Sequence, residues 1–214
     1  MLKKRCDTGL LVTFEGIEGV GKSTQTQLLK DALTAQGLPC YLTREPGGTD
    51  FGDRLRACLL QEYAHPLDAQ TELCLLLAAR RHHLQTVIRP KLAQGDIVIV
   101  DRFIDASLAY QGYGRGLSVE LIERLHRELN LDLTPSITFL LDAPLEVSRE
   151  RIKNRIFFDR IEREHNPFFI NVRNGYLEIA NNDPKRVHVL DACIQADLLA
   201  HTIFEKVTEI IYAQ

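Results

Sequence analysis

The first residues that could do chemistry are the eight at 16–23, which read GIEGVGKS and match the pattern G-x-x-x-x-G-K-[ST]. This spacing is typical of a loop whose backbone N–H groups wrap around phosphate oxygens at the start of a helix. In such a loop Lys22 reaches the β- and γ-phosphates and the Ser23 hydroxyl holds Mg²⁺. The alternative, a glycine-rich strand-to-helix turn without a ligand, is disfavoured by the apolar run before it and the helical period after it. We predict a nucleotide site.

The second candidate is the pair Asp101 and Arg102, which follows directly on the apolar run 97–100. A carboxylate at the end of a buried strand can reach Mg²⁺ through water, although an ordinary turn residue is the alternative. The sequence has no N-K-x-D for guanine and no D-x-x-G after a strand. A small-molecule kinase is therefore favoured over a switch GTPase.

These residues need a scaffold, and short apolar runs alternate with helical periods along the whole chain. The predicted strands are 10–14 (LLVTF), 40–43 (CYLT), 97–100 (IVIV), 137–141 (ITFLL) and 187–190 (VHVL). The predicted helices are 22–36, 50–61, 67–93 with a break at Pro90 left open, 118–129, 145–154, 167–181 and 195–212. Strands that alternate with helices predict a parallel doubly wound α/β sheet in a single domain, 1–214.

Composition limits the classes of partner. The 214 residues include 26 Lys or Arg and 29 Asp or Glu, which gives a formal charge of −3. This balance disfavours nucleic acid as a bulk partner. Five cysteines without a C-x-x-C pair argue against a disulfide framework and a zinc site. No apolar run approaches the ~20 residues of a membrane helix, and no signal peptide is recognisable, so we expect a cytoplasmic protein.

Four segments resemble the bacterial thymidylate kinase (dTMP kinase) family. They are FEGIEGVGKST at 14–24, TREPGGT at 43–49, DRFIDASLAYQGYGRG at 101–116 and DRIERE at 159–164. The third is the most specific. Other nucleoside monophosphate kinases share the fold without it.

The resemblance implies the three-layer P-loop NTPase fold, with a five-stranded parallel sheet in the order 2-3-1-4-5, helices on both faces and a small helical lid at about 149–164. It also implies transfer of the γ-phosphoryl group of Mg·ATP to dTMP, and a homodimer formed through helices around 67–93. The alternatives left open are another nucleoside monophosphate kinase and a P-loop regulator that binds ATP without transferring phosphate. A third, a DNA-repair or transport ATPase, is disfavoured by the charge of −3.

The resemblance also implies roles for individual residues. The donor would be bound by Gly16, Ile17, Glu18, Gly19, Val20, Gly21, Lys22, Ser23, Thr24, Arg151 and Arg160, and Mg²⁺ by Ser23 and Asp101. The acceptor would be bound by Glu18, Arg44, Arg56, Leu76, Arg80, Arg102, Ser107, Tyr110 and Gln111. Catalysis would depend on Lys22, Arg102 and Arg155.

Within this set Glu18 is expected to accept from the 3′-hydroxyl, as an uncompensated carboxylate in a loop built for anions. Arg102 is expected on the acceptor phosphate, since its fork suits phosphate. Tyr110 would pack on C2′ and exclude a 2′-hydroxyl.

Two positions depart from the family pattern. Leu76 stands where a phenylalanine commonly stacks on thymine, so stacking is weaker or is supplied elsewhere. Gly19 stands where some members carry an arginine, so the transition-state cation must come from the lid, where the resemblance assigns it to Arg155. The adjacent His82 and His83 cannot form a metal pair on a helix, and we expect them to be structural.

Overall fold

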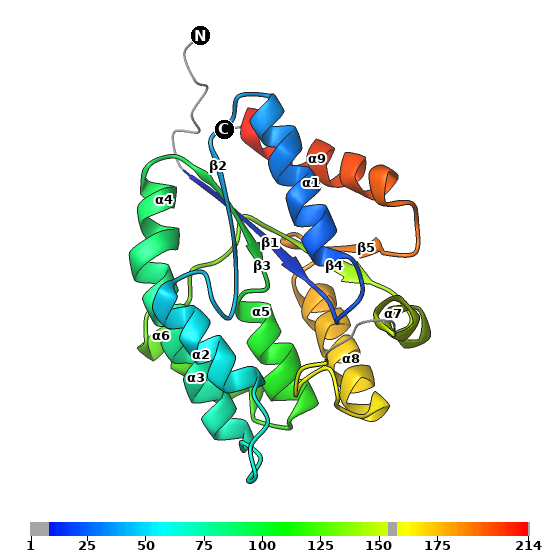
Figure 1. Ribbon diagram of the computed structural model, residues 1–214. Coiled ribbons are helices and arrows are strands. Elements are labelled where there is room, and N and C mark those ends of the chain that lie inside the picture. Colours follow the sequence, from blue (N-terminus) through cyan, green and yellow to red (C-terminus); the bar gives the residue numbers. More distant parts are fainter. Residues whose placement is uncertain (1–8, 154–157, 214) are drawn as a thin grey trace.

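The computed structural model describes residues 9–153 and 158–213 and shows five parallel strands in the order β2-β3-β1-β4-β5 (Figure 1). The predicted strand order is therefore confirmed. The strands are β1 (Leu10–Glu15), β2 (Cys40–Arg44), β3 (Ile97–Asp101), β4 (Ile137–Asp142) and β5 (Val187–Asp191).

Each strand runs one residue beyond its predicted end, and in every case that residue is charged. The five residues are Glu15, Arg44, Asp101, Asp142 and Asp191. Because the strands are parallel and in register, with Asp101 beside both Phe14 and Arg44, these charges gather at one edge of the sheet. Apolar runs end where the chain leaves the core, and this edge is where parallel sheets hold their ligands.

Most of the helices lie in the predicted intervals. The helices are α1 (Lys22–Ala35), α2 (Asp50–Leu60), α3 (Ala69–His83), α4 (Arg89–Ala93), α5 (Ile104–Ser107), α6 (Val119–Glu128), α7 (Leu145–Ile152), α8 (Asn166–Asn182) and α9 (Ala196–Ala213), with π-helical segments η1 (Leu84–Ile88) and η2 (Leu108–Gly114).

The helices cover both faces of the sheet (Figure 1). Helices α1 and α9 lie side by side on one face, where Leu29, Leu33 and Ile203 are fully buried. On the other face α3, η1 and α6 pack against the sheet. The central strands β1, β3 and β4 are buried along nearly their whole length, as their continuous apolar runs predict.

Pro90 does not break the helical region 67–93, the possibility that the sequence left open. The region runs from α3 through the wider turns of η1 into α4, and Pro90 lies in the first turn of α4. The missing N–H of a proline costs a helical hydrogen bond, and a π-helical stretch before it accommodates that loss.

The segments α5 and η2 were not among the predicted helices. In the fold, one glycine on η2 and one on α8 allow these two elements to approach closely. A Cβ on Gly114 would lie 2.7 Å from the ring of Phe168, and a Cβ on Gly175 would lie 2.5 Å from that of Tyr113.

The expectation of a helical lid is only partly correct. Helix α7 accounts for the first part, but the described residues from 158 to 165 form turns. Asp159 stabilises these turns because its Oδ1 accepts from the backbone N–H groups of Ile161 and Glu162, both at 2.9 Å. Arg155 lies outside the described residues.

Two further observations concern the described residues, 9–153 and 158–213. The four cysteines among them are free thiols. None of their helices combines the length and the apolar character needed to cross a membrane.

Candidate active site

The phosphate loop, residues 16–23, joins β1 to α1 and is closely enclosed by the chain around it. Gly16 has a φ of +130°, and a Cβ there would overlap the carbonyl of Leu141. Gly19 has a φ of +77°, and a Cβ there would lie 2.5 Å from the Ser148 carbonyl oxygen. The loop therefore has no room for a side chain at Gly19, and an arginine could not stand there.

Lys22 is buried at the first turn of α1. Its ammonium donates to the carbonyl oxygens of Gly16 at 3.0 Å and Ile17 at 2.7 Å, which closes the loop on itself. Burial, and next the positive charge of Arg102, lower the pKa of Lys22 to about 8. The side chain is thus largely charged at neutral pH, and an anion in the loop would stabilise that charge.

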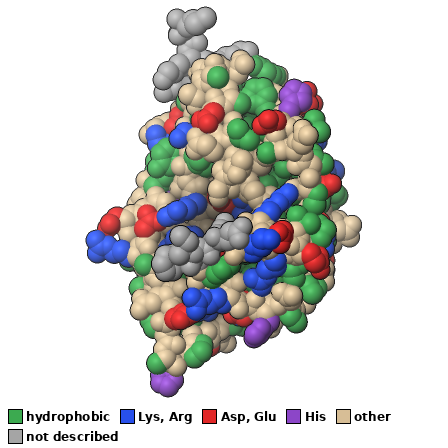
Figure 2. Space-filling view, turned by 45° about the vertical axis from the view of Figure 1, so that its right-hand side comes forward, with side chains coloured by type: hydrophobic (Ala, Val, Ile, Leu, Met, Phe, Trp, Pro, Cys, Tyr) green, Lys and Arg blue, Asp and Glu red, His purple; other side chains and the backbone are tan. Residues whose placement is uncertain are grey.

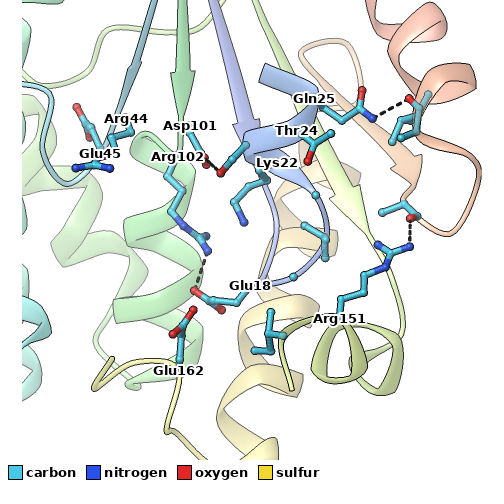
Figure 3. A pocket seen from close by; sticks show the side chains of 18 of the residues that line it. Glu18, Lys22, Thr24, Gln25, Arg44, Glu45, Asp101, Arg102, Arg151 and Glu162 are labelled. Carbon is cyan, nitrogen blue, oxygen red and sulfur yellow. Dashed lines mark hydrogen bonds and ion pairs between the residues drawn. The ribbon is translucent and has the colours of Figure 1, made fainter. Parts of the chain in front are cut away.

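The Ser23 hydroxyl and the Asp101 carboxylate meet at the edge of the sheet, where Ser23 donates to Asp101 Oδ2 at 2.9 Å (Figure 3). Ser23 follows the loop and Asp101 ends β3, so the fold joins two residues that the sequence singled out separately. Hard oxygen atoms of this kind suit Mg²⁺, which commonly takes one or two protein ligands and completes its shell with water and substrate phosphates.

Arg102 follows Asp101 with a φ of 68°, in the left-handed region, and points towards the loop. It donates to Glu18 Oε1 at 2.8 Å (Figure 3). It also donates to the Gly16 carbonyl at 2.7 Å. The Tyr110 hydroxyl also reaches Glu18, at 2.8 and 2.9 Å from its two oxygens. The expectation that Glu18 is uncompensated is wrong, because two long-range partners come from another part of the chain.

Glu15 is a buried carboxylate beneath Arg102 that sequence reasoning missed. Its oxygens accept from the Phe103 N–H and from the Tyr176 hydroxyl, both at 2.7 Å, and Arg102 donates to the same hydroxyl at 3.2 Å. Burial, and next the nearby Asp105, raise the pKa of Glu15 to about 7. The position of Glu15 directly before Gly16 was the only feature of the local sequence that pointed to it. Its partner Tyr176 lies 161 positions away, so the local sequence gave no indication of this contact.

A cavity of about 580 Å³ opens over the phosphate loop, and we call it the loop pocket. It is lined by Glu18, Gly19, Val20, Gly21, Lys22, Ser23, Thr24, Gln25, Arg44, Glu45, Arg56, Asp101, Arg102, Arg151, Ile152, Asp159, Glu162, Ala192, Ile194, Ala196 and Leu199. Lys and Arg side chains gather around the hollow in the middle of the face in Figure 2. The pocket therefore offers many donors to an anion.

A second pocket opens beside the first, between α2, α3, η2 and the turns after residue 158. It is lined by Glu18, Glu45, Pro46, Arg56, Leu59, Leu60, Glu72, Leu76, Arg80, Arg102, Ala106, Ser107, Tyr110, Gln111, Asp159 and Ile161. The two pockets share Glu18, Glu45, Arg56, Arg102 and Asp159. Ligands in the two pockets would meet at this shared wall.

Three arginines approach that wall. Arg56 donates to the Pro46 carbonyl at 3.1 Å, and its pKa is lowered by burial and next by the positive charges of Arg44 and Arg102. Arg44 is exposed and pairs with Asp53 at 3.2 Å. A phosphate between these groups would relieve their mutual repulsion.

Arg80 forms the floor of the second pocket and is only 2% exposed. It donates to Glu45 at 2.6 Å, to Ser107 and His126 at 2.9 Å, and to the Phe103 carbonyl at 2.8 Å. Burial, and next Arg80, lower the pKa of His126 to about 3, so this ring is neutral and accepts from Arg80. Arg80 is therefore held rigidly at the pocket wall, and its contact with a base stays a prediction.

The histidine pair does not form a metal site. His83 is fully buried between Thr43 Oγ1 at 2.8 Å and Glu45 Oε1 at 3.0 Å, while His82 faces Thr49. Within the described part of the chain, no group of three or more His, Cys, Asp or Glu side chains could hold a metal ion.

The arginines predicted for the donor side have separate places. Arg151 lines the loop pocket and donates to the Ala192 carbonyl at 2.9 Å (Figure 3). Arg160 does not line it. It donates to Glu72 Oε2 at 2.7 Å and to the Leu59 carbonyl at 3.0 Å, on the side of the second pocket. Its place beside the donor stays a prediction.

Comparison with known proteins finds the same family in each case. A family model described as thymidylate kinase matches residues 14–203. The thymidylate kinase of Ectopseudomonas mendocina is 47% identical over 196 residues, 89% of this chain and 93% of that protein. The thymidylate kinase of Methylococcus capsulatus is 48% identical over 185 residues, 86% and 88% of the two chains. The crystal structure of thymidylate kinase from Ehrlichia chaffeensis matches with a TM-score of 0.75 at 34% identity, over 94% of this chain and 99% of that one.

Proposed function

The chain belongs to the thymidylate kinase family, and from this premise we propose that the loop pocket takes ATP and the second pocket takes dTMP. An enzyme of this family transfers the γ-phosphoryl group of ATP to dTMP and releases dTDP and ADP. The shared wall of the two pockets supports this assignment, because the γ-phosphate of ATP and the phosphate of dTMP would have to meet there.

On the donor side, the backbone of the phosphate loop and the start of α1 bind the triphosphate, and Lys22 neutralises the β- and γ-phosphates. Ser23 and Asp101 would hold Mg²⁺, which would offset the negative charge of the donor phosphates. The 2.9 Å contact between the two side chains supports this pairing. Arg151 and Ile194 line the side of the pocket away from the shared wall and suit the rest of the nucleotide.

On the acceptor side, Arg102 binds the monophosphate, with Arg44 and Arg56 near it. Glu18 accepts from the 3′-hydroxyl and Tyr110 packs on the sugar, while Arg80, Ser107 and Gln111 face the base. Leu76 contributes an apolar wall. The second pocket brings most of these side chains together, and only Arg44 belongs to the loop pocket alone.

In the transfer, an oxygen of the acceptor phosphate forms a bond to the γ-phosphorus as the bond from that phosphorus to the ADP oxygen breaks. Negative charge spreads over the equatorial oxygens, where fixed cations stabilise it most. Lys22 lines the loop pocket and Arg102 belongs to the shared wall. Both are held by protein carbonyl groups, so they need little reorganisation.

The test is ADP release with ATP and dTMP, dUMP, dCMP, AMP or GMP as acceptor. We expect dTMP to be the best acceptor, dUMP to be weaker and the purine monophosphates to be inactive. If AMP outran dTMP, the acceptor assignment would be wrong. Lys22→Met should lower kcat steeply while the Kd for dTMP changes little, because the lysine charge acts on the transferring group.

Two expectations extend this proposal. A homodimer would form through the region 67–93, where Leu73, Leu77, Leu84 and Ile88 are buried in the core and only the outward face of the helices is available to a partner. A cytoplasmic location is expected from the sequence. Sedimentation of the purified chain tests the dimer.

A further inference from the structure

Gln111 has an unpaired acceptor in the second pocket. The side chain is only 3% exposed and lines the pocket. Its Nε2 donates to Glu72 at 2.7 Å, but its Oε1 is buried and has no hydrogen-bond partner within residues 9–153 and 158–213. A buried acceptor without a partner lowers stability, so we expect a ligand bound in this pocket to supply the missing donor.

Glu72 determines which way this amide points. Gln111 presents its NH₂ group to Glu72, whose oxygens already accept from Arg115 and Arg160, so the Gln111 carbonyl oxygen is left for another donor. Glu72 is itself fully buried on α3. If the amide turned over, the Gln111 carbonyl oxygen would face the Glu72 carboxylate, and neither group could donate a hydrogen bond to the other.

The orientation of Glu72 is fixed in turn by two guanidinium groups. Arg115 reaches both carboxylate oxygens at 3.3 Å, and Arg160 reaches Oε2 at 2.7 Å. Arg115 also donates to Glu164 at 2.6 Å. The two arginines and two glutamates balance in charge, so the fully buried carboxylate of Glu72 is paired on both of its oxygens.

We propose that Glu72 is a positioning residue that sets base specificity, by holding Gln111 with its carbonyl oxygen towards the base. A pyrimidine with an N3–H donor, such as thymine or uracil, satisfies that oxygen. Cytosine presents a bare N3 acceptor in the same place and is rejected. Glu72 touches neither reacting phosphate, and its effect passes through Gln111. The inference rests on the second pocket being the dTMP site.

The experiment is a double-mutant cycle measured as the Kd for dTMP by calorimetry. Glu72→Gln can donate as well as accept, so it frees the Gln111 amide to turn over, and the Kd should rise at least about fivefold. In the Gln111→Met background the same change should alter the Kd by less than about twofold. Equal effects in the two backgrounds would show that Glu72 acts through general packing and would overturn the proposal.

The second readout is the ratio of kcat/KM for dTMP to that for dCMP. It should fall at least about fivefold in Glu72→Gln, because a turned amide can donate to N3 of cytosine. Glu164→Gln is the matched control, since it removes the other carboxylate partner of Arg115 without touching Gln111, and its ratio should equal that of the wild type. A fall of the same size in the control would contradict the proposal.

A measurement on the wild-type protein covers the case in which Glu72→Gln does not fold. The side-chain NH₂ resonances of Gln111 should shift little when dTMP binds, because that group already donates to Glu72. A large shift would mean that the NH₂ faces the base, and the proposal would fail. Calorimetry and resonance shifts need binding alone, so a protein that binds dTMP without phosphorylating it would overturn the proposed function and still test Glu72.

Discussion

Arg102 and Glu18 form an ion pair at the wall that the two pockets share, with 2.8 Å between Nη2 and Oε1 and each side chain 16% exposed. The pair joins the phosphate loop to the end of β3. The guanidinium also donates to the Gly16 carbonyl and the Tyr176 hydroxyl and lies 4.9 Å from the centre of the Tyr110 ring. Its position is thus set by four groups before any phosphate arrives.

The first prediction concerns the fork of Arg102. Arg102→Lys keeps the charge but loses the planar set of donors, so it cannot serve Gly16, Glu18 and a phosphate together. We expect kcat/KM for dTMP to fall by about a hundredfold or more, a cost in line with the loss of one preorganised donor in a site of this kind. Arg44→Lys is the matched control at an exposed position and should lose less than about tenfold. Equal losses of kcat/KM in Arg102→Lys and Arg44→Lys would contradict a specific role for the guanidinium of Arg102 in binding the acceptor phosphate.

The second prediction concerns Tyr110, whose hydroxyl donates to both oxygens of Glu18 and whose ring contacts Phe168 and Tyr176 edge-on. Tyr110→Phe keeps the ring and should keep most of the preference for dTMP over its ribo analogue. Tyr110→Ala should open room for a 2′-hydroxyl and lower that preference. The measurement is the ratio of the two kcat/KM values. An unchanged ratio in Tyr110→Ala would assign the discrimination to another group.

The third prediction concerns pH and Glu15, whose pKa is raised from 4.5 to about 7 by burial and next by Asp105. Between these two values the folded protein binds more protons at Glu15 than the unfolded chain does. The contribution of this group to the free energy of unfolding therefore falls as pH rises from about 4.5 to 7. The fall is of the order of 3 kcal/mol.

Urea unfolding at several pH values tests it. Glu15→Gln should lose this part of the pH dependence, so that the variant gains stability relative to the wild type as pH rises from 5 to about 7. Glu120→Gln, at an exposed glutamate of α6, should leave the pH dependence as it is in the wild type. Parallel curves for Glu15→Gln and the wild type would contradict the raised pKa.

The sequence predicted the parts of the site that rest on local patterns. The loop spacing predicted the position of Lys22, and the end of an apolar run predicted Asp101, because both signals depend on neighbours in the chain. The contact between Ser23 and Asp101 followed from the strand order, since β3 lies next to β1 in the sheet.

The rest of the site depends on contacts between distant segments. Glu72 was not singled out, because a glutamate on a predicted helix is expected to face solvent. Only the folded structure shows that Gln111, Arg115 and Arg160 surround it. The need for glycine at position 114 of η2 is likewise explained only by the close approach of α8. The spacing of residues along the sequence does not identify such positions, because their environment forms only when distant segments pack together.

The last prediction concerns Leu76, which lines the second pocket with Leu59, Leu60 and Ala106 where the family resemblance implies an aromatic ring. Stacking of a base on an aromatic side chain is worth ~1–3 kcal/mol in single-strand binders, so Leu76→Phe should lower the KM for dTMP several-fold if the ring lies flat against the base. Leu75→Phe makes the same change one position along α3, outside the pocket lining, and should leave the KM unchanged. A tenfold rise in KM for Leu76→Phe alone would show that the neighbouring leucines already fill the space a ring needs, and that this chain recognises thymine by its hydrogen bonds and apolar walls without a stacked ring.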